Sequence, residues 1–102
     1  MINKEKFCEI ANDIIELNKQ RDALFNEAER WFNYEPFYEV VSDYIAIKAL
    51  AAAVDDKNWA VYDWFSESCY GEFSVDMVDD DDERVEVSTV EELYDFITRG
   101  KI

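Results

Sequence analysis

Apolar residues recur along the first third of the chain at alternating steps of three and four, which is the spacing of one helix face. The series consists of Phe7, Ile10, Ile14, Leu17, Leu24, Ala28 and Trp31, with Arg21 at its one position that is not apolar. Asn3 is of a type that caps helix N-termini. A helix should end before Pro36, because proline disfavours helical backbone in the preceding residue. The pattern therefore predicts a helix that begins after Asn3 and runs to about Phe32.

This heptad series has two interpretations. It could pack inside the monomer against a second helix, or it could form the interface of a homodimer. Arg21 would then pair with an acid of the same chain, or would fix the register of two chains. The sequence leaves both open.

A second helix is predicted from Pro36, which suits a first helical turn. Its apolar residues cover more than half of the circumference, which indicates a central position in the fold. They are Phe37, Val40, Val41, Tyr44, Ile45, Ile47, Leu50, Ala51 and Val54. We expect this helix to fold back on the first one as an antiparallel hairpin.

A third helix is predicted over residues 58–70. Its core face is expected to consist of Trp59, Tyr62, Phe65 and Cys69, and Gly71 is the expected residue after the cap. Trp64 and Tyr70 lie off this face. We therefore expect both to be exposed, and exposed Trp and Tyr side chains are typical binding anchors.

The period then changes to two, which predicts strands. The residues expected to point inward are Phe73, Val75, Met77, Val85 and Val87. A loop over residues 79–84 joins the two strands into an antiparallel hairpin.

A last short helix opens with a capping box formed by Ser88 and Glu91 and ends at Gly100. Its predicted apolar side consists of Val90, Leu93, Tyr94 and Ile97. The whole pattern predicts one α+β domain over residues 1–102. It comprises an N-terminal antiparallel helical hairpin, a third helix, a two-stranded antiparallel β-hairpin and a short C-terminal helix.

The net charge of the chain restricts the classes of partner that it can bind. Asp and Glu number 25 against 10 Lys and Arg, with no His, so the net charge is −15. Between residues 55 and 95 there are fifteen acids and only two bases, Lys57 and Arg84. Such a protein is repelled by nucleic acid and by anionic membranes. Catalysis or metal binding by His is excluded.

No run of 18 apolar residues exists, so we expect no membrane span. The N-terminal residues lack the unbroken apolar stretch of a signal peptide, and we expect a cytoplasmic protein. Cys8 and Cys69 are too far apart for a C-x-x-C motif. One disulfide between them is an alternative, but the absence of an export signal favours two reduced, mostly buried thiols.

The acidic run is the most conspicuous local feature, and it comprises Asp79, Asp80, Asp81, Asp82 and Glu83. A calcium loop of the EF-hand type needs Gly at its sixth position. If the loop begins at Asp76 this position is Asp81, and if it begins at Asp79 the position is Arg84, so the Gly is missing in both cases. The run is interpreted as a solvated hairpin tip, as an electrostatic contact surface or, least well, as a metal site.

The acids around this run share a pattern. Glu72, Asp76 and Glu86 should point outward from the hairpin together, while Asp63 and Glu67 share one face of the third helix. Neighbouring like charges are unfavourable. This repeated cost favours a surface that meets a basic partner, although drift toward an acidic, soluble surface is the other interpretation. The candidate partner-binding residues are Asp63, Trp64, Glu67, Glu72, Asp76, Asp79, Asp80, Asp81, Asp82, Glu83 and Glu86.

Catalytic motifs are not found. The sequence has no Gly-rich phosphate loop, no G-x-S-x-G and no Cys–His pair. We expect a protein that is not an enzyme and that binds no cofactor.

A short, acidic, helix-rich chain without catalytic groups resembles the phage-encoded anti-defence proteins, which include anti-restriction DNA mimics and anti-CRISPR inhibitors. Two stretches resemble small phage and mobile-element proteins. The first begins at Asp56-Lys57-Asn58-Trp59, continues through Trp64-Phe65 and ends at Tyr70-Gly71, and the second covers residues 89–97. The resemblance is one of overall pattern and assigns no individual residue.

The resemblance implies that spaced carboxylates occupy the basic channel of a CRISPR effector or restriction nuclease in place of DNA. A second hypothesis is a non-catalytic adaptor or dimerising module that uses the heptad series and the aromatic helix. A third is a calcium-responsive protein, which the missing Gly disfavours.

Overall fold

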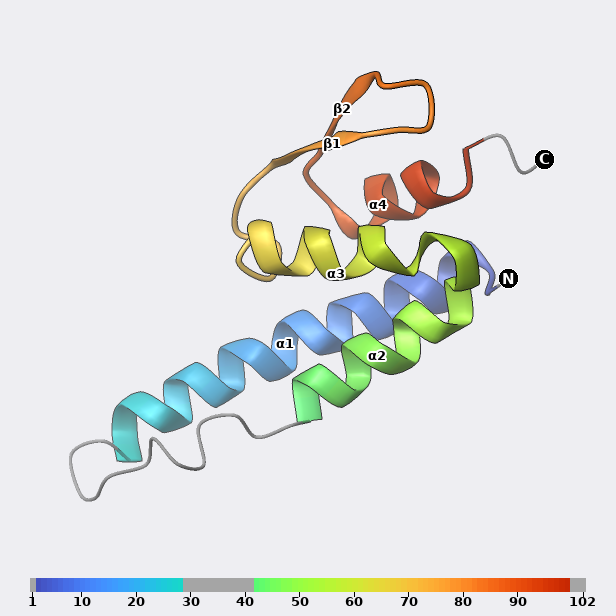
Figure 1. Cartoon of the computed structure of the whole chain (residues 1–102). Helices are drawn as coiled ribbons and strands as arrows, with labels where there is room; N and C mark the ends of the chain where they lie inside the picture. The colour runs from blue at the N-terminus through green and yellow to red at the C-terminus, as the bar shows by residue number, and fades with distance from the viewer. Residues whose placement is uncertain (1, 29–41, 100–102) are drawn as a thin grey trace.

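The computed structural model describes residues 2–28 and 42–99. Along these residues the order of elements is α1 (Lys4–Ala28), α2 (Ser42–Val54), a short 3-10 turn (Asp55–Lys57), α3 (Asn58–Glu67), β1 (Val75–Val78), β2 (Arg84–Val87) and α4 (Val90–Ile97). The predicted α+β class is confirmed for this part of the chain. α1 and α2 lie side by side, and α3 lies between this pair and the β-hairpin (Figure 1).

The two N-terminal helices are antiparallel. The Ile2 N–H lies 3.5 Å from the Ala53 carbonyl oxygen, which places the start of α1 beside the end of α2. The predicted N-cap is confirmed, because the Asn3 Oδ1 accepts a hydrogen bond of 2.8 Å from the Lys6 N–H. The expected end of α1 at Phe32 and the expected start of the second helix at Pro36 lie outside the described residues.

The buried face of α1 differs from the predicted heptad series. Phe7, Ala11, Ile14 and Asn18 are buried, whereas Leu17 is 41% exposed and Leu24 is 57% exposed. The physical reason is that α1 packs against both α2 and α4. The face of α1 that contacts these two helices is centred on Ala11 and Asn18. The spacing of the large apolar residues does not predict this face, because it includes a small and a polar residue.

Arg21 belongs to this rotated face. Its guanidinium donates to the Asn18 side chain, lies 3.3 Å from the Asp22 carboxylate and stands 5.8 Å from the centre of the Tyr70 ring. These contacts correspond to one of the two interpretations of Arg21, in which it pairs with an acid of its own chain.

Of the apolar residues predicted for the second helix, Phe37, Val40 and Val41 lie outside the described residues, and within α2 the prediction holds in part. Ile47, Leu50, Ala51 and Val54 are buried, while Ile45 is exposed. The helix therefore presents one apolar face to α1 and α3, and a polar face with Lys48 remains exposed.

The face of α3 is where the sequence-based expectation is wrong. Ala60, Val61, Trp64 and Phe65 are buried, and Trp64 is 0% exposed. Its indole Nε1–H donates a hydrogen bond of 3.1 Å to the Val87 carbonyl oxygen at the end of β2. Because this bond satisfies the polar atom of the indole, the large ring is buried without leaving an unpaired donor in the core. Trp64 is therefore a core residue and no exposed binding anchor.

The end of α3 also differs from the prediction. The helix ends at Glu67, and the Tyr70 N–H bonds to the Phe65 carbonyl oxygen over 3.1 Å, which closes the helix in a Schellman motif. Cys69, with φ of 52°, occupies the left-handed position expected for Gly71. Gly71 follows two residues later, with φ of 91°.

The hairpin has the predicted inward face for most of its length. Val75 pairs with Val87 and Met77 with Val85, and all but the half-buried Val85 are buried. Phe73 is 60% exposed, so its predicted inward orientation is wrong. Its N–H bonds to the Ser68 carbonyl oxygen, which keeps it in the turn after α3, before the alternation of the strand begins.

The capping box of α4 lies one residue later than predicted. Thr89 is the N-cap, and its Oγ1 accepts from the Glu92 N–H over 3.1 Å. The helix ends at Ile97, before Gly100, which lies outside the described residues. Its buried residues are Val90, Leu93, Phe96 and Ile97, so Phe96 replaces Tyr94 in the predicted core set.

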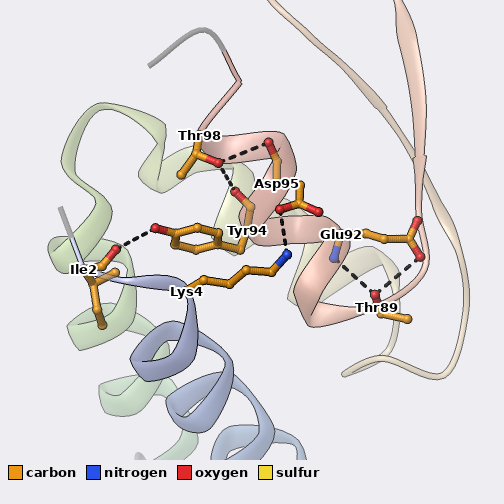
Figure 2. Close-up of polar contacts among 7 residues, drawn as sticks. All are labelled: Ile2, Lys4, Thr89, Glu92, Tyr94, Asp95 and Thr98. Atoms are coloured by element: carbon orange, nitrogen blue, oxygen red, sulfur yellow. Dashed lines mark hydrogen bonds and ion pairs between the residues drawn. The ribbon is translucent and has the colours of Figure 1, made fainter. Parts of the chain in front are cut away.

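Polar contacts join α4 to the beginning of α1 (Figure 2). The Tyr94 hydroxyl donates to the Ile2 carbonyl oxygen over 3.0 Å, and Lys4 Nζ lies 2.9 Å from Asp95 Oδ1. The hydrogen bond with Asp95 raises the pKa of Lys4 above its usual value. Residues more than 90 positions apart in sequence are thereby brought together.

Both cysteines are free thiols. Cys8 is half-buried and Cys69 is exposed, so the expectation of two mostly buried thiols is wrong for Cys69. Its place in the exposed turn after α3 explains the difference. Burial is the main cause that raises the pKa of Cys8 above its ordinary value, and the nearby Glu91 carboxylate adds to it.

This difference predicts selective thiol chemistry. At pH 8, iodoacetamide should alkylate Cys69 at least several-fold faster than Cys8, because Cys8 is less accessible and its raised pKa leaves less reactive thiolate. Raising the pH through the pKa of Cys8 should reduce the difference between the two alkylation rates. It should also destabilise the fold, since a pKa that is higher in the folded than in the unfolded state means that folding favours the protonated thiol. Mass spectrometry of peptides after timed alkylation measures both rates. Equal rates in the folded protein would contradict the prediction, and the urea-unfolded chain provides the control in which the rates should converge.

Candidate acidic binding surface

Most of the predicted binding acids are exposed on two parts of the structure. On the hairpin these are Asp76, Asp80, Asp81, Asp82, Glu83 and Glu86, which we call the acidic hairpin. On α3 and the turn after it, Asp63, Glu67 and Glu72 are exposed. Two members of the predicted set differ from the rest, because Trp64 is buried and Asp79 is half-buried.

Asp76 and Glu86 face each other across the two strands. The Asp79 N–H bonds to the Glu83 carbonyl oxygen, so alternation along the antiparallel ladder makes the Asp76–Glu86 pair a non-hydrogen-bonded one. Side chains of such pairs approach most closely, and like charges there are destabilising. Within the described residues no cation lies within 4 Å of either carboxylate. Their mutual repulsion is therefore not relieved by an ion pair.

The tip of the hairpin is a tight loop. The Asp82 N–H bonds to the Asp79 carbonyl oxygen over 3.1 Å, and Asp82 has φ of 61°. This combination corresponds to a three-residue loop in which a type I turn is followed by a left-handed residue. The loop holds Asp80 and Asp81 outward, where both side chains are exposed.

Asp79 stabilises this loop from inside. Its Oδ1 accepts hydrogen bonds of 2.9 Å from the N–H groups of both Asp81 and Glu83. Its Oδ2 lies 3.3 Å from the Arg99 guanidinium, and its side chain is only 12% exposed. The carboxylate predicted to contact a partner is thus engaged within its own chain.

Two cations partly neutralise one side of the tip. Lys57 Nζ lies 2.7 Å from Asp80 Oδ2, and Arg99 pairs with Asp79. A pocket of about 450 Å³ opens here, lined by both cations together with Asp56, Asp79, Asp80, Asp81 and Phe96. Sequence reasoning missed Arg99, because nothing in its neighbourhood links it to a loop twenty residues earlier.

In the described parts of the chain, no group of three or more Cys, Asp or Glu side chains is arranged to hold a metal ion. The acids of the tip are instead spread outward by the loop, and Asp79 uses its oxygens on backbone N–H groups and on Arg99.

The described helices include none that is both long and apolar enough to cross a membrane.

Comparisons with known proteins give no match. No protein-family model, no curated protein and no solved structure matches this chain. The charge, exposure and geometry of the surface are therefore the features that indicate a function.

Proposed function

We propose that this protein is an anti-defence inhibitor, encoded by a phage or mobile element, that occupies the basic nucleic-acid-binding surface of a bacterial nuclease effector of the CRISPR or restriction type. It would act inside the bacterial cell and without catalysis. The observation that carries the proposal is the Asp76–Glu86 pair: two exposed, directly opposed carboxylates with no cation within ion-pair distance in the described residues. A basic partner would relieve that repulsion.

The chemistry of the partner follows from the charge. Proteins hold DNA through Lys and Arg side chains that neutralise regularly spaced phosphates. Carboxylates on a hairpin can bind the same cations, and attraction between opposite charges accelerates the encounter. Such binding should weaken as salt increases.

The fixed shape of the hairpin supports the proposal. Asp79 binds two N–H groups of the loop, so the outward acids are displayed on a preorganised tip. In Figure 1 the hairpin loop lies away from the α1–α2 pair. Less conformational freedom is then lost on binding than with a flexible acidic tail.

A second candidate function is a non-catalytic adaptor or dimerising module. The observation that favours it is the exposure of Leu17 and Leu24, two members of the heptad series, along one side of α1. Binding through these residues should persist in high salt, whereas binding through the acidic hairpin should not.

The test compares two triple variants of equal charge. One is Asp76→Lys, Asp81→Lys and Glu86→Lys on the hairpin, and the other is Glu5→Lys, Asp13→Lys and Glu16→Lys on the exposed side of α1. Tagged proteins are used to capture partners from bacterial lysate at low and high salt, and any captured nuclease is then assayed for inhibition in vitro.

We expect the hairpin variant to lose inhibition on the order of a hundredfold, because three attractive contacts become repulsive. The α1 variant has the same net charge and should inhibit like the unmodified protein. Full inhibition by the hairpin variant would contradict the proposal. Capture of a partner that stays bound at high salt would favour the second candidate.

A further inference from the structure

Both edges of the two-stranded sheet are open in the described structure. The order of strands is β1–β2, so each strand has one partner and one outer edge. By the ladder alternation established above, the N–H and C=O groups of Arg84 and Glu86 point away from β1, and those of Asp76 and Val78 point away from β2. No backbone group of the described residues bonds to these four positions. Open edges of this kind accept an added strand.

The edge of β2 differs from that of β1 by what lies beside it. A second pocket, of about 270 Å³, is lined by Val85 and Glu86 of β2 and by residues of α4 and the turn after it, with none from β1. The lining residues from α4 and that turn are Glu92, Asp95, Phe96 and Arg99. β1 instead packs against α3. A strand added to β2 would therefore find a partly apolar hollow under its inward-facing side chains.

The charge around this hollow indicates the occupant. Glu86 stands on the strand, and Glu92 is exposed on α4. Asp95 contacts Lys4, and Arg99, the one cation among the described residues that line the hollow, is already paired with Asp79. The edge thus combines outward N–H and C=O groups with Glu86 on the exposed face of the strand and Glu92 beside the hollow, while Arg84 is the one cation of β2 itself.

We propose that the outer edge of β2 is the docking site for an extended basic segment of the partner protein, which adds to the sheet as a third strand. Alternate side chains of that segment would enter the hollow beside Val85 and Phe96, and Lys or Arg side chains between them would lie against Glu86. This inference rests on the proposed function only in taking the partner to be a basic protein. It adds that main-chain hydrogen bonds provide register and specificity, which charge alone cannot provide.

The structure provides a matched pair of variants. Glu86→Pro removes an outward N–H from the β2 edge, and Asp76→Pro removes one from the β1 edge at the directly opposed position. Neither N–H takes part in the ladder, and proline is tolerated in an edge strand when its nitrogen faces outward. Each change also removes one acid, so Glu86→Gln and Asp76→Asn serve as controls for charge.

The probe is a synthetic eight-residue peptide of alternating valine and lysine, acetylated and amidated at its ends. NMR titration of the full chain gives the affinity, and hydrogen exchange reports protection of the Arg84 and Glu86 amides. We expect protection at these two amides and about a tenfold weaker affinity for Glu86→Pro than for Glu86→Gln, which corresponds to the loss of one or two hydrogen bonds. Asp76→Pro should bind as Asp76→Asn does.

A second probe keeps the proposal falsifiable if Glu86→Pro does not fold. Two further versions of the peptide, one with N-methylated lysines and one with N-methylated valines, retain every charge, and each lacks the donors of one edge. The lysine N–H groups face β2 if the segment adds antiparallel and the valine N–H groups face β2 if it adds parallel, so one of the two versions should bind the unmodified protein about tenfold more weakly. Equal binding of all three peptides, or protection at Asp76 and Val78 in place of Arg84 and Glu86, would overturn the proposed docking site and leave the proposed function standing. Protection at β2 combined with full nuclease inhibition by the charge-reversed hairpin would instead refute the proposed function.

Discussion

Replacing Trp64 by alanine should lower the free energy of unfolding by about 3–5 kcal/mol, which is a large part of the stability of a domain of this size. The side chain is 0% exposed and stacks edge-to-face on Phe65 with ring centres 5.1 Å apart. Its removal would leave a cavity and would also remove the donor for the Val87 carbonyl. Urea unfolding followed by far-UV circular dichroism measures the loss.

The matched control is Trp59→Ala, in the same helix. Trp59 is 40% exposed and has one edge-on contact with Phe96, at 6.2 Å between ring centres. We expect a loss of about 1 kcal/mol or slightly more, since a partly exposed aromatic contact contributes on that scale. A larger loss for Trp59→Ala than for Trp64→Ala would mean that α3 faces the core with its other side, as the sequence alone predicted.

Replacing Asp79 by alanine should lower the free energy of unfolding by about 2–3 kcal/mol. The carboxylate accepts two backbone hydrogen bonds in a tight loop and contacts Arg99. Hydrogen bonds to charged groups contribute about 1.5–3 kcal/mol. The ion pair with Arg99 adds little, since the side chain of Arg99 is about half exposed and screened by solvent. Thermal and urea unfolding both give the measurement.

The control for this prediction is Asp81→Ala in the same loop. Asp81 is exposed, and its replacement also removes one acid, so its effect should lie within about 0.5 kcal/mol of zero. If both variants lose the same stability, the carboxylate of Asp79 does not stabilise the loop. If Asp79→Ala alone is destabilised, any loss of partner binding by this variant is to be attributed to a disordered tip and not to a lost contact.

The type and order of the elements could be predicted from the sequence, because each carries a local signal. The Asn3 cap and the alternation through Val75, Met77 and Val87 depend only on neighbouring residues, and the structure confirms them. Gly71 was a weaker guide. The turn after α3 also places Cys69 and Tyr70 in left-handed conformations, which their residue types do not predict.

The orientation of α3 could not be predicted from its pattern. Its apolar residues surround most of the helix, so several faces satisfy the same periodicity. The choice is made by tertiary partners, above all by the Val87 carbonyl that receives the Trp64 indole N–H from a strand 23 residues later. The same reason explains the partial exposure of Leu17, because α1 has two packing partners and the heptad spacing describes a helix with one.

The sequence predicts which acidic residues of the candidate site are exposed, but it does not predict the long-range contacts that these residues make. Exposure of Asp63, Asp76 and Glu86 follows from the position of each in its element, and the structure confirms it. The ion pair of Asp79 forms only in the folded chain, which brings Arg99 to the hairpin. Long-range ion pairs of this kind are not encoded by spacing along the sequence.

The contacts between α1 and α4 have a consequence for how the chain acquires its fold during synthesis. Ile2 and Lys4 are translated more than 90 residues before their partners Tyr94 and Asp95. Contacts of such long sequence separation form late and slow the folding of a domain. The start of α1 therefore lacks these partners on the nascent chain until α4 is made. A chain stalled before α4 would also lack the Tyr94 ring, whose centre lies 5.3 Å from that of Phe7.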